Sequence, residues 1–139
     1  MPTLVNIQTF PNIAARAEAK YPVYAAHMRS LHQRHVDTVG KAVDAGVPVY
    51  AGTDAGGTIA HGQISTEIRL LSQLRDPLFG LGAASWRARS WLTGDQAAAG
   101  LGVGAAADLL VLDADPRRDV TAIAHPTFVV LRGRVLRDR

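Results

Sequence analysis

The chain has 139 residues, a formal net charge of +3 and a hydrophobic content of 47%. That composition is sufficient for one domain with a buried core and argues against wholesale disorder. The absence of cysteine excludes disulfides and thiolate metal sites, and no apolar run approaches the length of a membrane span.

The ends of the chain bear on its location and partners. Residues 1–6 have no basic flank and no long apolar region, so we expect no secretory signal and a cytoplasmic protein. Arginines crowd the C-terminus, as they do on nucleic-acid surfaces. Aspartates such as Asp113, Asp115 and Asp119 are interleaved with them, and Phe128 is the sole aromatic residue there. We therefore expect neither a nucleic-acid nor a membrane partner.

The first part of the chain predicts a strand end followed by two helices. Residues 3–5 are short, apolar and partly β-branched, which is typical of a strand. Residues 13–20 favour a helix. Apolar side chains then recur every three or four positions from Tyr24 to Val43, which predicts a longer helix that ends at Gly46.

A second strand and a further helix follow. Residues 47–51 are typical of a buried strand, with Pro48 at its start, where a missing N–H matters least. An apolar stripe over residues 64–74 predicts the next helix. Helix, strand and helix in this order predict an α/β protein with parallel strands.

Near residue 105 the predicted elements change from helices to short strands. Gly80 and Gly82 predict a loop, residues 83–92 a helix, and residues 95–107 a connector. Short segments then predict one strand, a helical turn and a hairpin that turns at a glycine. These segments are residues 109–112, residues 120–124, and residues 127–136 with Gly133 at the turn.

The sharpest motif is Gly-Thr-Asp-Ala-Gly at residues 52–56. It places the Asp54 carboxylate just past the end of the predicted buried strand, the edge at which active sites of parallel α/β proteins lie. A carboxylate there can bind a divalent metal and accept a proton. The alternative is an ordinary turn, because Asp and Gly are both common turn residues.

Several stretches in this order resemble the amidohydrolase superfamily, in particular its imidazolonepropionase-like and prolidase-like members. Residues 2–4 resemble the seventh strand of that family's barrel, and residues 45–56 resemble the eighth strand with its following loop. The remaining stretches resemble the last barrel helix, the helix after it and the small β-sandwich: His61-Gly62 with Glu67, residues 84–92, residues 107–116 and residues 129–135.

The resemblance implies the last two β/α units of a TIM-like metal-dependent hydrolase barrel in residues 1–104. It implies short antiparallel strands of the small β-sandwich in residues 105–139. It further implies hydrolysis of a C–N bond, amide or cyclic amide, in a small-molecule substrate, with a divalent metal, zinc being the expected ion. Asp54 would be the metal ligand and general base, and His61 a substrate contact.

Histidines elsewhere have simpler explanations. A polar residue at a helix N-terminus is the alternative for His61, and Glu67 is expected to be structural. His32 and His35 are spaced i, i+3, which can hold a metal. They lie among Arg29, Gln33 and Arg34, however, so a solvated helix face is the favoured interpretation.

The family's other ligands, a His-x-His pair, a modified Lys or a Glu, and two single histidines, have no counterpart here. One carboxylate cannot hold a catalytic zinc, so we expect the isolated chain to be inactive. Open barrel edges would favour self-association. Two alternatives stay open: a non-catalytic remnant that folds alone or docks on a partner chain, and an unrelated small α/β binding domain in which Asp54 is a turn residue.

Overall fold

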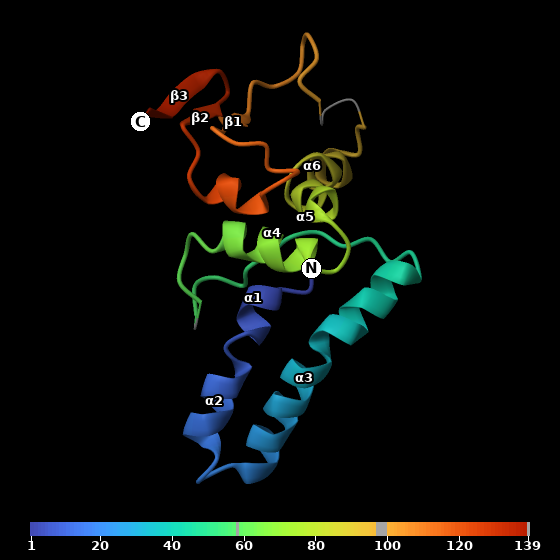
Figure 1. The fold of residues 1–139 in the computed structure, drawn as a ribbon, viewed down its shortest axis with the longest axis vertical. Helices are drawn as coiled ribbons and strands as arrows, with labels where there is room; N and C mark the ends of the chain where they lie inside the picture. The colour runs from blue at the N-terminus through green and yellow to red at the C-terminus, as the bar shows by residue number, and fades with distance from the viewer. Residues whose placement is uncertain (58, 97–99, 139) are drawn as a thin grey trace.

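A computed structural model describes residues 1–57, 59–96 and 100–138 of the chain. Figure 1 shows α2 and α3 as a helical pair that extends from the rest of the molecule, with a small sheet at the opposite end. The elements are α1 (Leu4–Ile7), α2 (Phe10–Ala17), α3 (Pro22–Asp44), α4 (Ile64–Ser72), α5 (Pro77–Ala84), α6 (Trp86–Thr93), β1 (Leu109–Val111), the 3₁₀ helix η2 (Val120–Ala124), β2 (Phe128–Leu131) and β3 (Arg134–Asp138).

The predicted helices at residues 13–20, 24–43 and 64–74 are confirmed as α2, α3 and α4. Pro22 begins α3 at a position where a proline costs no hydrogen bond, and Gly46 follows the helix end with φ 81°. No described helix combines the length and the apolar content that crossing a bilayer requires.

The buried apolar side chains form two clusters. The larger one joins α1, α3, α4, α5 and the loop before α4, and the smaller one lies between α2 and α3. Leu4 and Leu71 are the largest fully buried apolar residues. Among the described residues, every buried hydrophobic side chain precedes residue 84. The core therefore depends on the helical part of the chain.

The C-terminal segment forms the three-stranded antiparallel sheet β1-β2-β3, and this confirms the predicted strands and hairpin. Arg132 and Gly133 connect β2 to β3 with φ 50° and 74°, the double positive φ that a tight hairpin turn requires. Asp108 holds this turn to α6: its carboxylate accepts from the Arg132 N–H at 2.7 Å and from Arg89 Nη1 at 3.0 Å. These two donors lower the pKa of Asp108.

Both predicted parallel strands are wrong for this chain. Residues 3–5, expected to end a strand, overlap the helical turn α1, which spans Leu4–Ile7, and residues 47–51 belong to no helix or strand. A strand is stable only when a neighbour accepts its backbone hydrogen bonds. The Ala51 N–H donates instead to the Ala83 carbonyl of α5, at 2.9 Å. The chain is thus an α/β protein with one small antiparallel sheet in its described part.

The helix boundaries between residues 76 and 94 also differ from the prediction. Gly80 and Gly82, expected in a loop, lie inside α5, and the helix predicted for residues 83–92 is interrupted at Ser85, where φ is −130° and ψ is −103°. Asp76 begins α5 by accepting the Phe79 N–H, at 2.7 Å. Of the connector predicted for residues 95–107, residues 97–99 lie outside the described part, and the rest contains no helix or strand.

Gly80 allows the close approach of α5 to α4, and this yields a stability prediction. A Cβ atom at Gly80 would lie 2.9 Å from the Ser72 backbone nitrogen and closer still to the Ile68 carbonyl oxygen. We expect Gly80→Ala to lower the free energy of unfolding by about 2 kcal/mol, as overpacking does. Chemical denaturation measures the change.

Gly40 in α3 is the matched control for this prediction. A Cβ atom there would meet nothing within 4 Å, so Gly40→Ala should raise the free energy of unfolding by about 1 kcal/mol through helix propensity. Equal effects of the two substitutions would contradict the proposed contact between α4 and α5.

Candidate functional site

Asp54 lies in a glycine-flanked loop between α3 and α4. Its side chain is exposed and its backbone has φ 54°, a left-handed conformation that Asp tolerates better than most residues. The loop closes on itself, since the Gly56 N–H donates to the Ile59 carbonyl at 3.1 Å and Ala55 pairs with Ile59 in a single parallel bridge. The Asp54 carboxylate is therefore presented to solvent by a closed loop.

Asn6 of α1 is the hydrogen-bond partner of this carboxylate. Its Nδ2 donates to Asp54 Oδ2 at 2.7 Å, although 48 residues separate the two in sequence. Thr9 Oγ1 in turn donates to the Asn6 carbonyl at 2.7 Å and lies 3.5 Å from Asn6 Oδ1, which favours the amide orientation that directs Nδ2 to Asp54. The sequence interpretation missed Asn6, because the residue was placed at a strand end and carries no motif.

Glu67 of α4 anchors the helical turn that carries Asn6. Its carboxylate is fully buried and accepts the Leu4 N–H at 3.0 Å and the Val5 N–H at 2.7 Å. Desolvation raises the pKa of Glu67, and the two backbone N–H groups oppose that shift. These contacts agree with the structural role expected for Glu67, and they connect α4, through α1, to Asp54.

His61 lies in the turn that precedes α4, and its side chain is exposed. It belongs to the same connection between α3 and α4 as Asp54, yet no hydrogen bond joins His61 to any described residue. The role of His61 as a substrate contact therefore stays a prediction.

His32 and His35 of α3 differ from a simply solvated helix face. Both side chains are half-buried, whereas His27 on the same helix is exposed. The two rings lie 5.2 Å apart between centroids, and both approach the side-chain amide of Gln8, the residue that ends α1.

The described residues do not by themselves fit a catalytic metal. No three His, Cys, Asp or Glu side chains within them are arranged to hold an ion. Asp54 is the one metal ligand predicted from the sequence. Its hydrogen-bond partner, Asn6, carries an amide group and therefore adds no second carboxylate. A catalytic zinc needs about three protein ligands, so Asp54 supplies at most a part of such a site.

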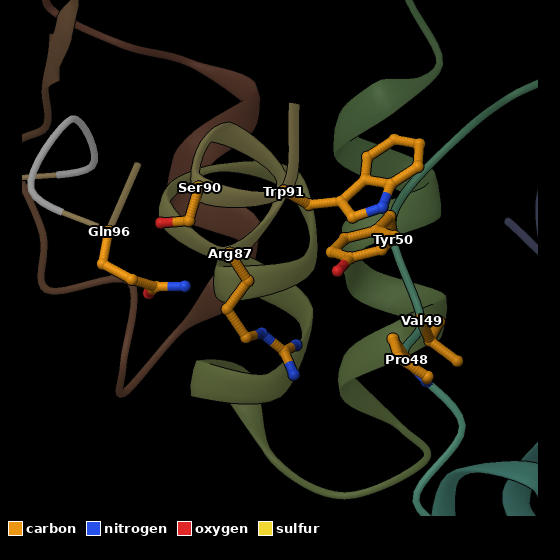
Figure 2. A pocket seen from close by; sticks show the side chains of 7 residues that line it. All are labelled: Pro48, Val49, Tyr50, Arg87, Ser90, Trp91 and Gln96. Atoms are coloured by element: carbon orange, nitrogen blue, oxygen red, sulfur yellow. The ribbon is translucent and has the colours of Figure 1, made fainter. Parts of the chain in front are cut away.

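A groove of about 290 Å³ lies between α6 and residues 48–50. Figure 2 shows the Tyr50 and Trp91 rings stacked there, with centroids 4.8 Å apart, and Arg87 and Ser90 on the helix. The Arg87 guanidinium lies 4.6 Å above the Phe79 ring and donates to the Phe79 carbonyl. Asp54, Asn6 and His61 do not line this groove.

The chain is similar to longer proteins of mycobacteria. It is 49% identical over 135 residues to uncharacterized proteins of Mycobacterium tuberculosis and Mycobacterium bovis. These alignments cover 96% of this chain and 35% of each relative, so the chain spans about a third of the length of the curated relatives it matches. No model of a known protein family matches it.

Solved structures similar to this chain include two peptidases. A prolidase in complex with N-methylphosphonate-L-proline shares 26% identity at a TM-score of 0.77, covering 99% of this chain and 34% of the prolidase. An uncharacterized protein gives 26% identity and a TM-score of 0.78 with the same coverage. A Xaa-Pro dipeptidase with methionine in its active site has a TM-score of 0.73 at 21% identity, which shows a shared fold.

Proposed function

We propose that the chain is the C-terminal portion of a metal-dependent amidohydrolase that hydrolyses a C–N bond, and that the isolated chain is not catalytically competent. The observation that carries the proposal is the prolidase similarity, which extends over 99% of this chain but only 34% of the prolidase. The missing two thirds are the expected source of the remaining active-site groups.

In the proposed enzyme, residues 1–104 would contribute the last two β/α units of a TIM-like barrel and residues 105–139 the strands of a small β-sandwich. Residues 47–51 would then gain the strand neighbours that they lack in the isolated chain, and Asp54 would follow them at the catalytic edge. Asn6 supports this role, because an amide donor at 2.7 Å restricts the rotation of the Asp54 carboxylate.

Asp54 is proposed as one metal ligand and as the general base, and His61 as a substrate contact. Zinc is the proposed ion, and groups outside this chain would have to complete its coordination. The prolidase and Xaa-Pro dipeptidase similarities make a dipeptide ending in proline the first substrate to test, before cyclic amides. A cytoplasmic location accompanies the proposal.

The alternative is a non-catalytic chain that docks on a partner. Its support is the lack of a three-donor metal site among the described residues, together with the apolar side chains that the small sheet leaves exposed. The two proposals make different demands on the source DNA. The enzyme requires an upstream frame, continuous with Met1, that encodes a His-x-His pair and two later histidines. A stop codon directly before Met1 would favour the docking chain.

Both proposals predict that the isolated chain self-associates. Leu136 in β3 is 61% exposed, and Leu110, Val111, Leu131 and Val135 of the same sheet are exposed as well. Sedimentation velocity should show the weight-average mass rising with concentration, because exposed apolar surface of this kind drives association.

Charge substitutions locate the associating surface. Leu136→Lys should reduce the association, and Val23→Lys, at an exposed position of α3 at the other end of the molecule, should not. A chain that stays monomeric at all concentrations would contradict the prediction.

A further inference from the structure

The contact between Asn6 and Asp54 has a fixed direction. An ionised carboxylate can only accept a hydrogen bond, so the Asn6 amide must turn Nδ2, and not Oδ1, toward Asp54 Oδ2 at 2.7 Å. Thr9 Oγ1 lies 3.5 Å from Asn6 Oδ1, on the oxygen side of the amide. Both ends of the amide therefore lie where their hydrogen-bonding chemistry requires.

The backbone that carries Asn6 is held in place without any help from Asp54. The two residues before it, Leu4 and Val5, are buried, and both donate their N–H groups to the buried Glu67 carboxylate. The helical turn is thus fixed from the side of the core, while the Asn6 side chain extends from it to the exposed Asp54. Asn6 therefore approaches the carboxylate from a support that packing and hydrogen bonds both hold.

The contact uses only one of the two carboxylate oxygens. Among the described residues, Asp54 Oδ2 has Asn6 as its donor, whereas Asp54 Oδ1 has no donor. The amide carries no charge. It can therefore orient the carboxylate without neutralising the negative charge that attracts a cation, as a lysine or an arginine at position 6 would do. Asp54 Oδ1 is left available, with the charge of the carboxylate intact.

We infer that Asn6 is a positioning residue, which holds the Asp54 carboxylate by Oδ2 and so fixes the orientation in which Oδ1 is available. The inference rests on the proposed function, in which Asp54 is a metal ligand and the general base. A carboxylate that rotates freely about its Cβ–Cγ bond spends part of its time in unproductive orientations, and a group that takes part in a reaction loses rate when it is misplaced. Asn6 acts only through Asp54 and takes no part in the chemistry itself.

Side-chain amide signals in ¹H–¹⁵N spectra of the 139-residue chain test the contact without any measurement of activity. Asp54→Asn should shift the side-chain NH₂ signals of Asn6, because their charged acceptor is lost. Asp44→Asn, which removes an exposed carboxylate elsewhere, should leave these signals in place. The side-chain amide of Asn12, an exposed residue of α2, is the internal control in both variants. Unmoved Asn6 signals in Asp54→Asn would overturn the inference.

The role of the contact is tested in an assembled enzyme, in which this chain is joined to the part of the Mycobacterium tuberculosis relative that the alignment does not cover. Asn6→Ala should lower kcat for a Xaa-Pro dipeptide about tenfold to a hundredfold, the range for a residue that orients a metal ligand. KM should change by less than about twofold, because Asn6 is not a substrate contact. Asn12→Ala is the matched control and should keep the parent kcat.

Two further variants separate positioning from the filling of space. Asn6→Asp keeps the size of asparagine but places a second carboxylate against Asp54, so at neutral pH its kcat should fall below that of Asn6→Ala. A packing role predicts the reverse order. Asn6→Gln keeps the amide donor and should retain more kcat than Asn6→Ala.

The outcomes distinguish this inference from the proposed function. An active parent enzyme whose kcat is unchanged by Asn6→Ala, or in which Asn6→Asp is more active than Asn6→Ala, would overturn the inference and leave the proposed function standing. A parent enzyme without hydrolase activity would contradict the proposed function, and the inference with it.

Discussion

Replacement of Asp54 by asparagine is expected to lower kcat/KM for a Xaa-Pro dipeptide by about 10²–10⁴-fold in the assembled enzyme, the range for a positioned proton-transfer group. The assembled enzyme can be made by joining this chain to the part of the Mycobacterium tuberculosis relative that the alignment does not cover; the two share 49% identity over 135 residues. Asparagine keeps the size of the side chain but cannot accept the proton.

Two further variants make this result specific. Asp44→Asn removes an exposed carboxylate that pairs with Arg75 at 3.2 Å, and it should leave kcat/KM unchanged. His61→Gln should raise KM with little change in kcat, as the loss of a substrate contact does. Full activity of the Asp54→Asn enzyme would contradict the assignment of the general base.

Replacement of Glu67 by alanine is expected to produce a large loss of stability. The change leaves the Leu4 and Val5 N–H groups without their acceptors at a fully buried position. Two unpaired buried donors predict a loss of about 3 kcal/mol or more in the free energy of unfolding. Urea denaturation of the isolated chain measures it. A loss no larger than that of an exposed carboxylate, such as Glu18→Ala, would contradict the anchoring role.

The same carboxylate predicts a pH dependence of stability. Burial raises the pKa of Glu67 above its ordinary value of 4.5, so the folded chain binds this proton more tightly than the unfolded chain. The stabilisation by the proton is complete below 4.5 and is lost as the pH rises through the folded-state pKa. Glu67→Gln should remove this decline of stability above pH 4.5.

Glu18 serves as the control for the pH dependence. The hydrogen bond from Arg29 lowers the pKa of Glu18. The stability that the ionised Glu18 carboxylate contributes is therefore lost only as the pH falls below 4.5, the ordinary pKa of this group. Glu18→Gln should therefore leave the slope of stability against pH above 4.5 as it is. An unchanged slope in Glu67→Gln would contradict the raised pKa.

Local patterns were sufficient for the elements that depend on local interactions. The apolar stripe between Tyr24 and Val43 predicted α3, because helix hydrogen bonds form within the segment itself. The hairpin around Gly133 was predicted for the same reason, since its turn requires a positive φ that glycine adopts freely.

The predicted parallel strands failed because a strand depends on segments distant in sequence. Residues 47–51 have strand-like composition, yet their backbone finds a helix carbonyl, Ala83, in place of a neighbouring strand. The prediction that Gly80 lies in a loop was wrong for a related reason. Its proximity to Ser72 comes from the packing of two helices, and no local signal distinguishes such a glycine from one in a loop.

The candidate site could be predicted only in part. The glycines around Asp54 predicted its loop, but Asn6 is 48 residues, and Glu67 62 or 63 residues, from the groups that they contact. Their roles emerge only when α1 folds against α4. The pairing of Gln8 with His32 and His35 arises in the same way, from the approach of the end of α1 to α3.

The content of tightly held zinc per chain is the measurement that most directly tests the central claim, namely that this chain supplies only part of a metal site. It should be determined by elemental analysis after dialysis against a chelator, in the isolated chain, in the assembled enzyme and in the Asp54→Asn variant of each. With one ligand present, the isolated chain should retain less than about a tenth of an equivalent, and the assembled enzyme about one equivalent or more, which Asp54→Asn reduces. Near one equivalent in the isolated chain, lost in its Asp54→Asn variant, would mean that this chain builds the metal site alone.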